Sequence, residues 1–144
     1  VVTTYFDEKL AAALPSEHIE GLYGCIDYYQ TVSDPFSKEL LGRYNARFPE
    51  GPHFSAGSGS TGMYRGLKLW EAAVTEAGSL DQAAVVAALD HAKLAESPGG
   101  PVEMVPGQHH VRMNMYIARS ESGTFKVLKN LGYIDPNECE VGRA

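Results

Sequence analysis

The sequence lacks several features that mark whole classes of protein. It has 144 residues and a net charge of -6, with no run of Lys or Arg. Binding to nucleic-acid phosphates needs concentrated positive charge, so the composition argues against a nucleic-acid partner. The longest apolar stretches, such as residues 83–89, are far shorter than a membrane span. What remains is an ordinary globular composition, with 44% hydrophobic and 10% aromatic residues.

Cysteine is scarce. Cys25 and Cys139 are far apart and form no CxxC pair, which argues against a dithiol redox or metal motif. Cys25 falls in a predicted core strand, where a small buried thiol is the simpler interpretation, and Cys139 falls in a polar tail. A disulfide between them in an oxidising compartment stays an alternative.

Recognisable catalytic patterns are also absent from the sequence. The pair His109-His110 invites a metal or general-base role, since imidazole commonly serves in both. Adjacent side chains of an extended segment point to opposite faces, however, and no third ligand sits at a helpful spacing. No HExxH or GxSxG motif occurs. We therefore predict no metal, no cofactor and no enzymatic activity; a small α/β hydrolase or oxidoreductase is the remote alternative.

Residues 57–62, GSGSTG, match the pattern GxGxxG of dinucleotide-binding loops. That motif requires a preceding strand, whereas residues 49–56 are rich in Pro and Gly, and no Lys follows the last Gly. We interpret the segment as a loop whose Ser or Thr caps the next helix. Anion binding at its amides is the alternative.

Three helices are predicted in the middle of the chain. Asp34 and Pro35 suit the N-cap and first position of a helix that ends before Pro49. A second helix carries the apolar stripe Met63, Leu67, Trp70, Val74 and Ala77 and ends at Gly78. The pair Ser79 and Gln82 predicts a capping box for a third helix, ending near His91. The acids at positions 7, 8 and 90 are expected to be helix-terminal or exposed.

Strands are predicted before, between and after these helices, so the fold class is α/β. In the last predicted strand, apolar side chains alternate with the others at Val111, Met113, Met115 and Ile117. Residues 121–123, ESG, supply a turn, and Phe125 and Val127 alternate on the return strand. The pattern predicts a β-hairpin near the end of the chain, with the first set of side chains facing the core.

Several segments, taken in order, resemble the type I periplasmic solute-binding proteins. Residues 20–29 resemble the strand that enters the region between the two lobes, and residues 34–40 the helix that follows. Residues 64–78 resemble the helix that ends in the family's usual Ala-Gly-Ser, and residues 99–110, with GGPVEMV and QHH, resemble the C-terminal region. The resemblance covers roughly residues 1–136 and is closest to the branch that binds amides, urea and branched-chain amino acids.

The resemblance implies part of a two-lobed α/β fold, with sheets flanked by helices and a C-terminal β-hairpin. Family members are longer, so we expect residues 1–144 to be the C-terminal part of a solute-binding domain. Roughly residues 1–48 would belong to the second lobe, 58–95 to helices of the first lobe, and 100–130 to strands and a hairpin that return to the second. The missing N-terminal half would then be a partner of this chain, which alone is expected to form oligomers.

The resemblance also implies a function. The chain would belong to the substrate-binding component of an ABC transporter in the periplasm, closing around a short amide, urea or an amino acid and then meeting a membrane permease. The alternative is a cytoplasmic amide sensor of the same fold. The implied ligand-binding residues are Thr3, Thr4 and Tyr5, which end the first strand, and Asp27 and Tyr28, which approach the region between lobes. Structural roles stay open, because threonines often cap helices and tyrosines are common in strands.

Overall fold

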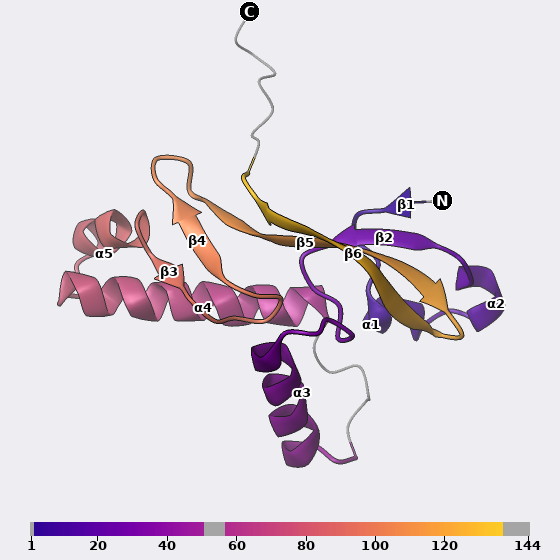
Figure 1. Cartoon of the computed structure of the whole chain (residues 1–144). Coiled ribbons are helices and arrows are strands. Elements are labelled where there is room, and N and C mark those ends of the chain that lie inside the picture. The colour runs from indigo at the N-terminus through magenta and orange to yellow at the C-terminus, as the bar shows by residue number, and fades with distance from the viewer. Residues whose placement is uncertain (1, 51–56, 137–144) are drawn as a thin grey trace, which may run out of the picture.

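The computed structural model describes residues 2–50 and 57–136, which form a mixed α/β fold with a sheet flanked by helices (Figure 1). The fold class is as predicted. The strands are β1 (Val2–Thr3), β2 (Tyr23–Ile26), β3 (Lys93–Leu94), β4 (Val102–Val105), β5 (His110–Glu121) and β6 (Thr124–Ile134). The helices are α1 (Glu8–Ala11), α2 (Ser16–Ile19), α3 (Pro35–Arg47), α4 (Ser58–Ala77) and α5 (Gln82–Leu89).

The strands form one sheet in the order β1-β2-β5-β4-β3, and β6 pairs with the other side of β5. Strands β1 and β2 run parallel, and the other described pairs are antiparallel. The predicted hairpin is confirmed: β5 and β6 are joined through Ser122 and Gly123, with φ of 52° and 78°. Positive φ at both central residues matches the twist of antiparallel strands and gives a tight two-residue turn.

Two separate hydrophobic clusters stabilise the fold. The first joins residues of the β1–β2 end to β5 and β6, and contains Ala11, Ile19, Ile26, Tyr28, Tyr29, Val32, Tyr116, Ala118 and Phe125. The second lies between α4, α5 and strands β3 and β4, and contains Leu69, Ala73, Val85, Ala88, Ala92, Val102 and Met104. Strand β5 contributes residues to both regions, with Tyr116 and Ala118 in the first cluster and Val111 and Met113 packed against the second.

The prediction of which β5 side chains face the core is confirmed for only one half of the strand. Val111 and Met113 pack against the second cluster. In the other half, Tyr116 and Ala118 are buried, whereas the predicted Met115 and Ile117 are half-buried. Strands twist along their length, so the side of β5 that faces the core changes between its two ends. Period-two alternation alone does not show such a change.

Helix α4 begins earlier than the sequence predicted. Residues 58–62 are helical, so the GxGxxG segment is the first turn of α4 rather than a loop. The backbone N–H of Ser58, the first residue of the helix, donates a hydrogen bond to Oδ2 of Asp7 at 3.0 Å. The other end is as predicted, because Gly78 adopts the left-handed conformation with φ of 59°. Helix α5 is capped by Asp81, not by Ser79, because the Asp81 Oδ1 accepts from the Ala84 N–H at 3.0 Å.

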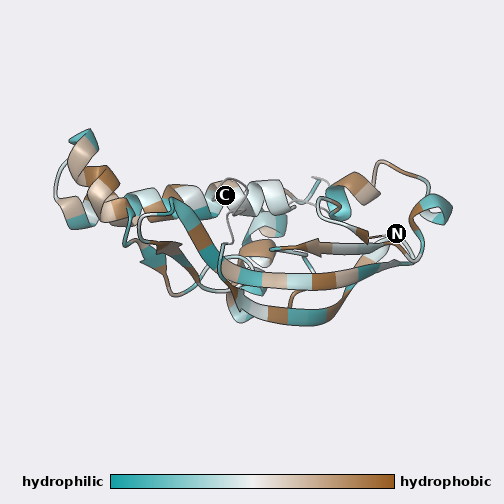
Figure 2. Cartoon of the chain, turned by 90° about the horizontal axis from the view of Figure 1, so that it is seen from above, coloured by the Kyte–Doolittle hydropathy of each residue, from teal (hydrophilic) through white to brown (hydrophobic). Residues whose placement is uncertain are grey.

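The predicted apolar stripe of α4 is largely exposed. The exposed fractions of Met63, Leu67 and Trp70 are 66%, 60% and 50%. The buried face of the helix is instead Thr61, Arg65, Leu69 and Ala73. Helix α5 is apolar on all sides, as its brown colour at one end of the molecule shows (Figure 2), and its Val86 is 47% exposed. Together α4 and α5 therefore present an apolar face that no described residue covers.

Helix α3 projects from the body of the molecule (Figure 1). Its predicted N-cap is confirmed, because Asp34 Oδ1 accepts from the Ser37 N–H at 2.8 Å and Pro35 takes the first position. Its apolar side chains are half-buried or exposed, and Phe48 is 49% exposed. Phe36 contacts Tyr64 of α4, with ring centroids 6.1 Å apart. The half-buried Cys25 lies in β2, whereas Cys139, its predicted alternative disulfide partner, lies outside the described residues.

Candidate functional site

The candidate site lies at the carboxyl ends of β1 and β2. Because these strands are parallel, Thr3, Thr4 and Tyr5 at the end of β1 and Asp27 after β2 reach the same edge of the sheet. The N-terminus of α4 meets this edge, as the contact of Ser58 with Asp27 shows. In open α/β sheets, ligands bind in the crevice outside the carboxyl ends of the strands. The structure therefore brings four of the five predicted residues to a position suited to binding.

Tyr5 stands at the rim of this site. Its side chain is 69% exposed, and a Cβ atom added at Gly59 would lie 3.9 Å from its hydroxyl oxygen, so the ring leans over the first turn of α4. The hydroxyl of Thr3 accepts a hydrogen bond from the Tyr5 backbone N–H at 3.2 Å and fixes the chain at this point. Thr4 is exposed beside it. An exposed aromatic ring next to hydroxyl groups is typical of a binding wall.

Asp27 is held in a dense polar network. One carboxylate oxygen accepts a hydrogen bond from the Ser58 hydroxyl at 2.7 Å, and the other forms an ion pair with the Arg65 guanidinium. The side chains of Arg65 and Asp27 are only 7% and 13% exposed. Arg65 also donates to the Pro98 carbonyl at 2.8 Å. The network ties β2, α4 and the loop before β4 together.

Arg65 carries its charge inside the fold. Burial lowers the pKa of Arg65 to about 10, which still leaves the guanidinium protonated at neutral pH. A buried charge of this kind needs both a counter-ion and hydrogen bonds, and Asp27 and Pro98 supply them. The pair therefore presents little net charge to a ligand, and the polarity of the site comes mainly from its neutral donors.

Asp7 positions two helices at once. Its Oδ1 accepts from the N–H groups of Lys9 and Leu10 at 3.0 and 3.1 Å, and its Oδ2 accepts from that of Ser58. A Cβ atom added at Gly57 would lie 2.5 Å from Oδ2, so a larger residue there would displace the Asp7 carboxylate. The prediction that Asp7 is helix-terminal is confirmed, and it fixes the start of α4 against the end of β1.

Two neighbouring residues are buried instead of facing the site. Tyr28 is 1% exposed and belongs to the first hydrophobic cluster, where burial raises the pKa of its hydroxyl. Glu8 was predicted to be helix-terminal or exposed; it begins α1 but is only 2% exposed, and its Oε1 accepts from the Gln30 N–H at 2.9 Å. Burial raises the pKa of Glu8 to about 7. Its burial follows from the packing of α1 over the sheet.

The arrangement offers hydrogen-bond donors to a ligand. In the first turn of α4, the N–H of Ser58 bonds to Asp7 and that of Ser60 to the Gly57 carbonyl. Gly59 belongs to the same first turn, and the Tyr5 hydroxyl lies close to this residue. The N-terminus of a helix carries partial positive charge. A carbonyl or carboxylate oxygen would be bound favourably there.

Metal and membrane features were searched over residues 2–50 and 57–136. No three His, Cys, Asp or Glu side chains gather there in a way that could hold a metal ion. His109 lies in a turn with φ of 54°, and His110 begins β5. None of the helices in this part of the chain is long and apolar enough to cross a membrane.

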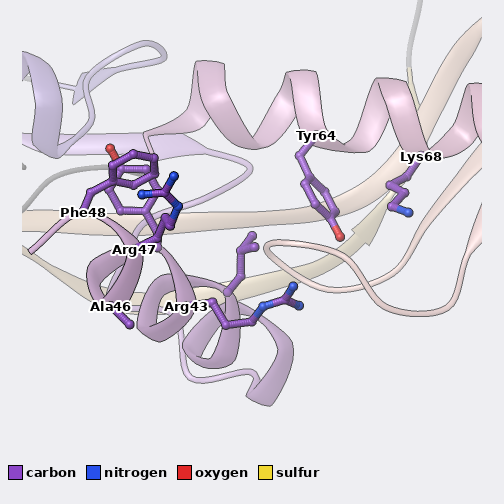
Figure 3. Close-up of a pocket in the computed structure, with 8 residues that line it drawn as sticks. Arg43, Ala46, Arg47, Phe48, Tyr64 and Lys68 are labelled. Atoms are coloured by element: carbon purple, nitrogen blue, oxygen red, sulfur yellow. The ribbon is translucent and has the colours of Figure 1, made fainter.

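A separate, open groove lies between α3 and α4 and has a volume of about 870 Å³. Figure 3 shows Tyr64 and Lys68 of α4 on one side and Arg43 and Arg47 of α3 on the other. Two of its basic side chains form ion pairs within their own helices. The Arg43 guanidinium lies 3.9 Å from the Glu39 carboxylate, and the Lys68 ammonium lies 2.6 Å from the Glu71 carboxylate. The groove contains none of the predicted site residues.

Sequence reasoning missed Ser58 and Arg65. A signal for Ser58 was present, because a serine just after Gly57 precedes an amphipathic helix, but the segment looked like a loop. Arg65 lies four residues after Thr61 and four before Leu69, so it falls on the buried face of α4. The exposed face of α4, with Leu67 and Trp70, is more apolar, so the periodicity of the sequence favoured that face as the buried one. Only the tertiary structure shows that Asp27 is the partner of Arg65.

Comparison with known proteins identifies the family of this chain. The model of the periplasmic binding protein family matches residues 1–124, and the chain belongs to that family. No curated protein sequence matches the chain.

Solved structures of several binding proteins have the same fold. One from Rhodopseudomonas palustris, in complex with 3,4-dihydroxybenzoic acid, is 23% identical, with a TM-score of 0.72 over 90% of this chain and 34% of that one. An amino-acid transporter's binding protein from Pseudomonas fluorescens is 22% identical, with a TM-score of 0.72 over 91% and 36%. A leucine-binding protein from Thermotoga maritima is 15% identical, with a TM-score of 0.69 over 85% and 34%. The chain thus spans about a third of the length of these proteins.

Proposed function

We propose that the chain is part of the substrate-binding component of an ABC transporter, and that it binds a small polar solute without converting it. The main support is that Tyr5 and Asp27 both contact the N-terminus of α4, at the carboxyl ends of two parallel strands. A ligand held there would be enclosed by closure of two lobes about a hinge. In this proposal the protein works in the periplasm, which the description of the family supports, and a membrane permease is its next partner.

The two hydrophobic clusters support a division into two lobes. The first cluster would belong to the second lobe, built from the first part of the chain and the β5–β6 hairpin, and the second cluster to the first lobe, built around α4 and α5. The segments between the clusters would then form the hinge. In this proposal the rest of the first lobe comes from an N-terminal half outside these residues. That half would cover the exposed stripe of Met63, Leu67 and Trp70.

The donors at the site favour a ligand with a carbonyl or carboxylate oxygen. Short amides, urea and amino acids all carry one, and we propose a solute from this group. The binding proteins described above include a leucine-binding protein and one in complex with 3,4-dihydroxybenzoic acid, and both of those compounds are carboxylic acids. In our proposal the oxygen accepts from the Gly59 N–H and the Tyr5 ring covers the rest of the solute.

A thermal-stability screen of the full-length protein tests the proposal. Urea, acetamide, leucine and other amino acids would be compared with nucleotides and divalent metals. A bound ligand at about 100 times its dissociation constant adds roughly 2.7 kcal/mol to the free energy of unfolding. We expect at least one carbonyl solute to do so. Stabilisation by a nucleotide or metal alone would contradict the proposal.

Replacing Tyr5 tests the site itself. Tyr5→Ala in the full-length protein should weaken binding of the solute found in the screen by about tenfold or more, roughly 1.4 kcal/mol. The melting temperature should change little, because the side chain is 69% exposed. Tyr133→Ala, at another partly exposed tyrosine on β6, is the matched control. Unchanged affinity together with a collapsed melting temperature would make Tyr5 a structural residue.

A further inference from the structure

A second cavity lies between the segment after β2, the loop before β4 and the β5–β6 hairpin. It has a volume of about 490 Å³ and is lined by residues 31–34, by Gly100 and Pro101, and by side chains of β5 and β6 that face them. We call it the junction cavity. It shares no lining residue with the site around Tyr5, Asp27 and Ser58. It is also more polar than a gap left by imperfect packing, since Asp34, Asn114 and Tyr116 belong to its wall.

One side chain determines the charge of the junction cavity. Asp34 is the single charged residue among the described residues that line it. Its Oδ1 accepts from the Ser37 N–H and caps α3, but its Oδ2 is buried and has no hydrogen-bond partner in the described structure. A buried acceptor without a donor costs free energy, on the order of 1–3 kcal/mol and more when it is charged. A donor that enters the cavity would recover that cost.

The neighbouring wall is rigid. The hydroxyl of Tyr116 donates to the Gly99 carbonyl at 2.8 Å, and the Asn114 Nδ2 donates to the same oxygen at 3.1 Å. A Cβ atom added at Gly100 would lie 2.4 Å from the Asn114 Nδ2, so the turn closes tightly on this side chain. Burial raises the pKa of Tyr116, and the negative charge of Asp34 adds to the increase. The field of Asp34 therefore reaches the wall opposite it.

We propose that the junction cavity binds a small organic ammonium compound. The ammonium group would donate to Asp34, and the aliphatic part would lie against Val32, Pro101 and Leu128. An anion is disfavoured because no Lys or Arg lines the cavity. A divalent metal such as Ca²⁺ needs six or more oxygen ligands, and one carboxylate does not supply them. An ammonium group needs only one carboxylate and a few acceptors.

The position of the cavity gives such binding a structural effect. The loop before β4 lies between the two sites: its Pro98 carbonyl accepts from Arg65 of the first site, and its Gly99 carbonyl accepts from Tyr116 of the junction cavity. An occupant of the cavity would therefore restrain the segments that connect the clusters. It would bind in addition to the solute at the first site.

Calorimetric titration of the full-length protein with n-butylamine, compared with sodium butyrate and n-butanol at equal ionic strength, tests the proposal. Butylamine should bind saturably, and the acid and the alcohol should not. Asp34→Asn should weaken butylamine binding by tenfold or more while keeping the cap of α3, because asparagine caps helices well. Glu39→Gln is the control: it removes one negative charge from the same helix at a side chain that is 70% exposed and outside the cavity.

A second variant keeps the test decisive if Asp34→Asn proves unstable. Leu128 is 46% exposed at the rim, and Leu128→Lys would place an ammonium group of the chain near Asp34 and abolish butylamine binding. Tyr5→Ala should leave butylamine affinity unchanged, which separates this proposal from the one for the first site. Equal binding of butylamine and butyrate, unchanged affinity in both cavity variants, or no binding at roughly 10 mM amine would overturn the proposal.

Discussion

At the scale of single residues, the buried pair of Asp27 and Arg65 is the strongest electrostatic contact beside the candidate site. Removing one partner of a buried pair leaves an uncompensated charge. Asp27→Ala should therefore lower the free energy of unfolding of the full-length protein by about 3–5 kcal/mol, measured by urea denaturation. The Ser58 hydroxyl would also lose its acceptor.

The double variant Asp27→Leu with Arg65→Met is the control for that prediction. It removes both charges and fills the space with apolar groups, so a large part of the loss should be recovered. If the two single changes each cost less than about 1 kcal/mol, or if their costs simply add, the pair is more hydrated than its exposure indicates.

Glu8 predicts a dependence of stability on pH. Burial raises its pKa from the ordinary value of 4.5 to about 7 in the folded chain, so the folded state binds more protons than the unfolded state between these values. The free energy of unfolding should therefore fall as pH rises from about 5 to about 7, by up to about 3 kcal/mol, and level off above.

Glu8→Gln isolates this contribution. The amide cannot ionise, and its oxygen can still accept from the Gln30 N–H. The variant should match the natural protein at pH 5 and exceed it in stability at pH 8, as measured by denaturation at both values. Equal stability of the two proteins at pH 8 would show that Glu8 ionises in the fold without cost.

At the scale of elements, the sequence predicted the helix ends and the turn whose geometry depends on a few neighbouring residues. Pro35 after Asp34, Gly78 after an amphipathic helix, and a turn with Ser122 and Gly123 each fix a backbone geometry within a few residues. Such features could be predicted from the sequence, and the structure contains them. The position of Thr3, Thr4 and Tyr5 at the end of the first strand was also predicted, whereas Asp27 was assigned to the site only through the family resemblance.

Features that depend on distant contacts were not predictable. The first turn of α4 forms in a glycine-rich segment because Asp7, 51 residues earlier, bonds its first amide. The buried face of α4 contains Arg65 because Asp27 neutralises it, whereas the stronger stripe with Leu67 is exposed. Burial of Tyr28 likewise depends on strands that follow far later in the chain. A periodic pattern identifies an apolar face but not what covers it.

At the scale of the whole molecule, the exposed apolar face of α4 and α5 predicts association. Large apolar patches on isolated chains favour self-association, and the chain spans only about a third of its solved relatives. Residues 1–144 alone should be oligomeric or poorly folded and should show no saturable binding of the solute, as measured by light scattering and calorimetry. A monomer that melts cooperatively and binds the solute would contradict the proposed division into lobes.

A surface variant supplies the control for this prediction. Met63→Lys, Leu67→Glu and Trp70→Gln together remove the stripe from exposed positions of α4. The isolated chain should then show markedly less association at the same concentration. The same three changes in the full-length protein should lower its stability, because there we propose that the stripe is covered.

Strand β5 is a single continuous ribbon that serves both clusters, and this sets the mechanics of the molecule. Strands twist about their own axes, so the hydrogen-bonded pair of β5 and β6 can change its shape by twisting. Two register shifts along β5 leave Leu131 and Leu128 as extra residues in β6, and bulges of this kind interrupt the ladder and increase the local twist. In the proposed division into lobes, rotation of one half of the molecule against the other would therefore wind or unwind this strand pair about its long axis. The strand pair itself would then supply the elastic resistance to that rotation.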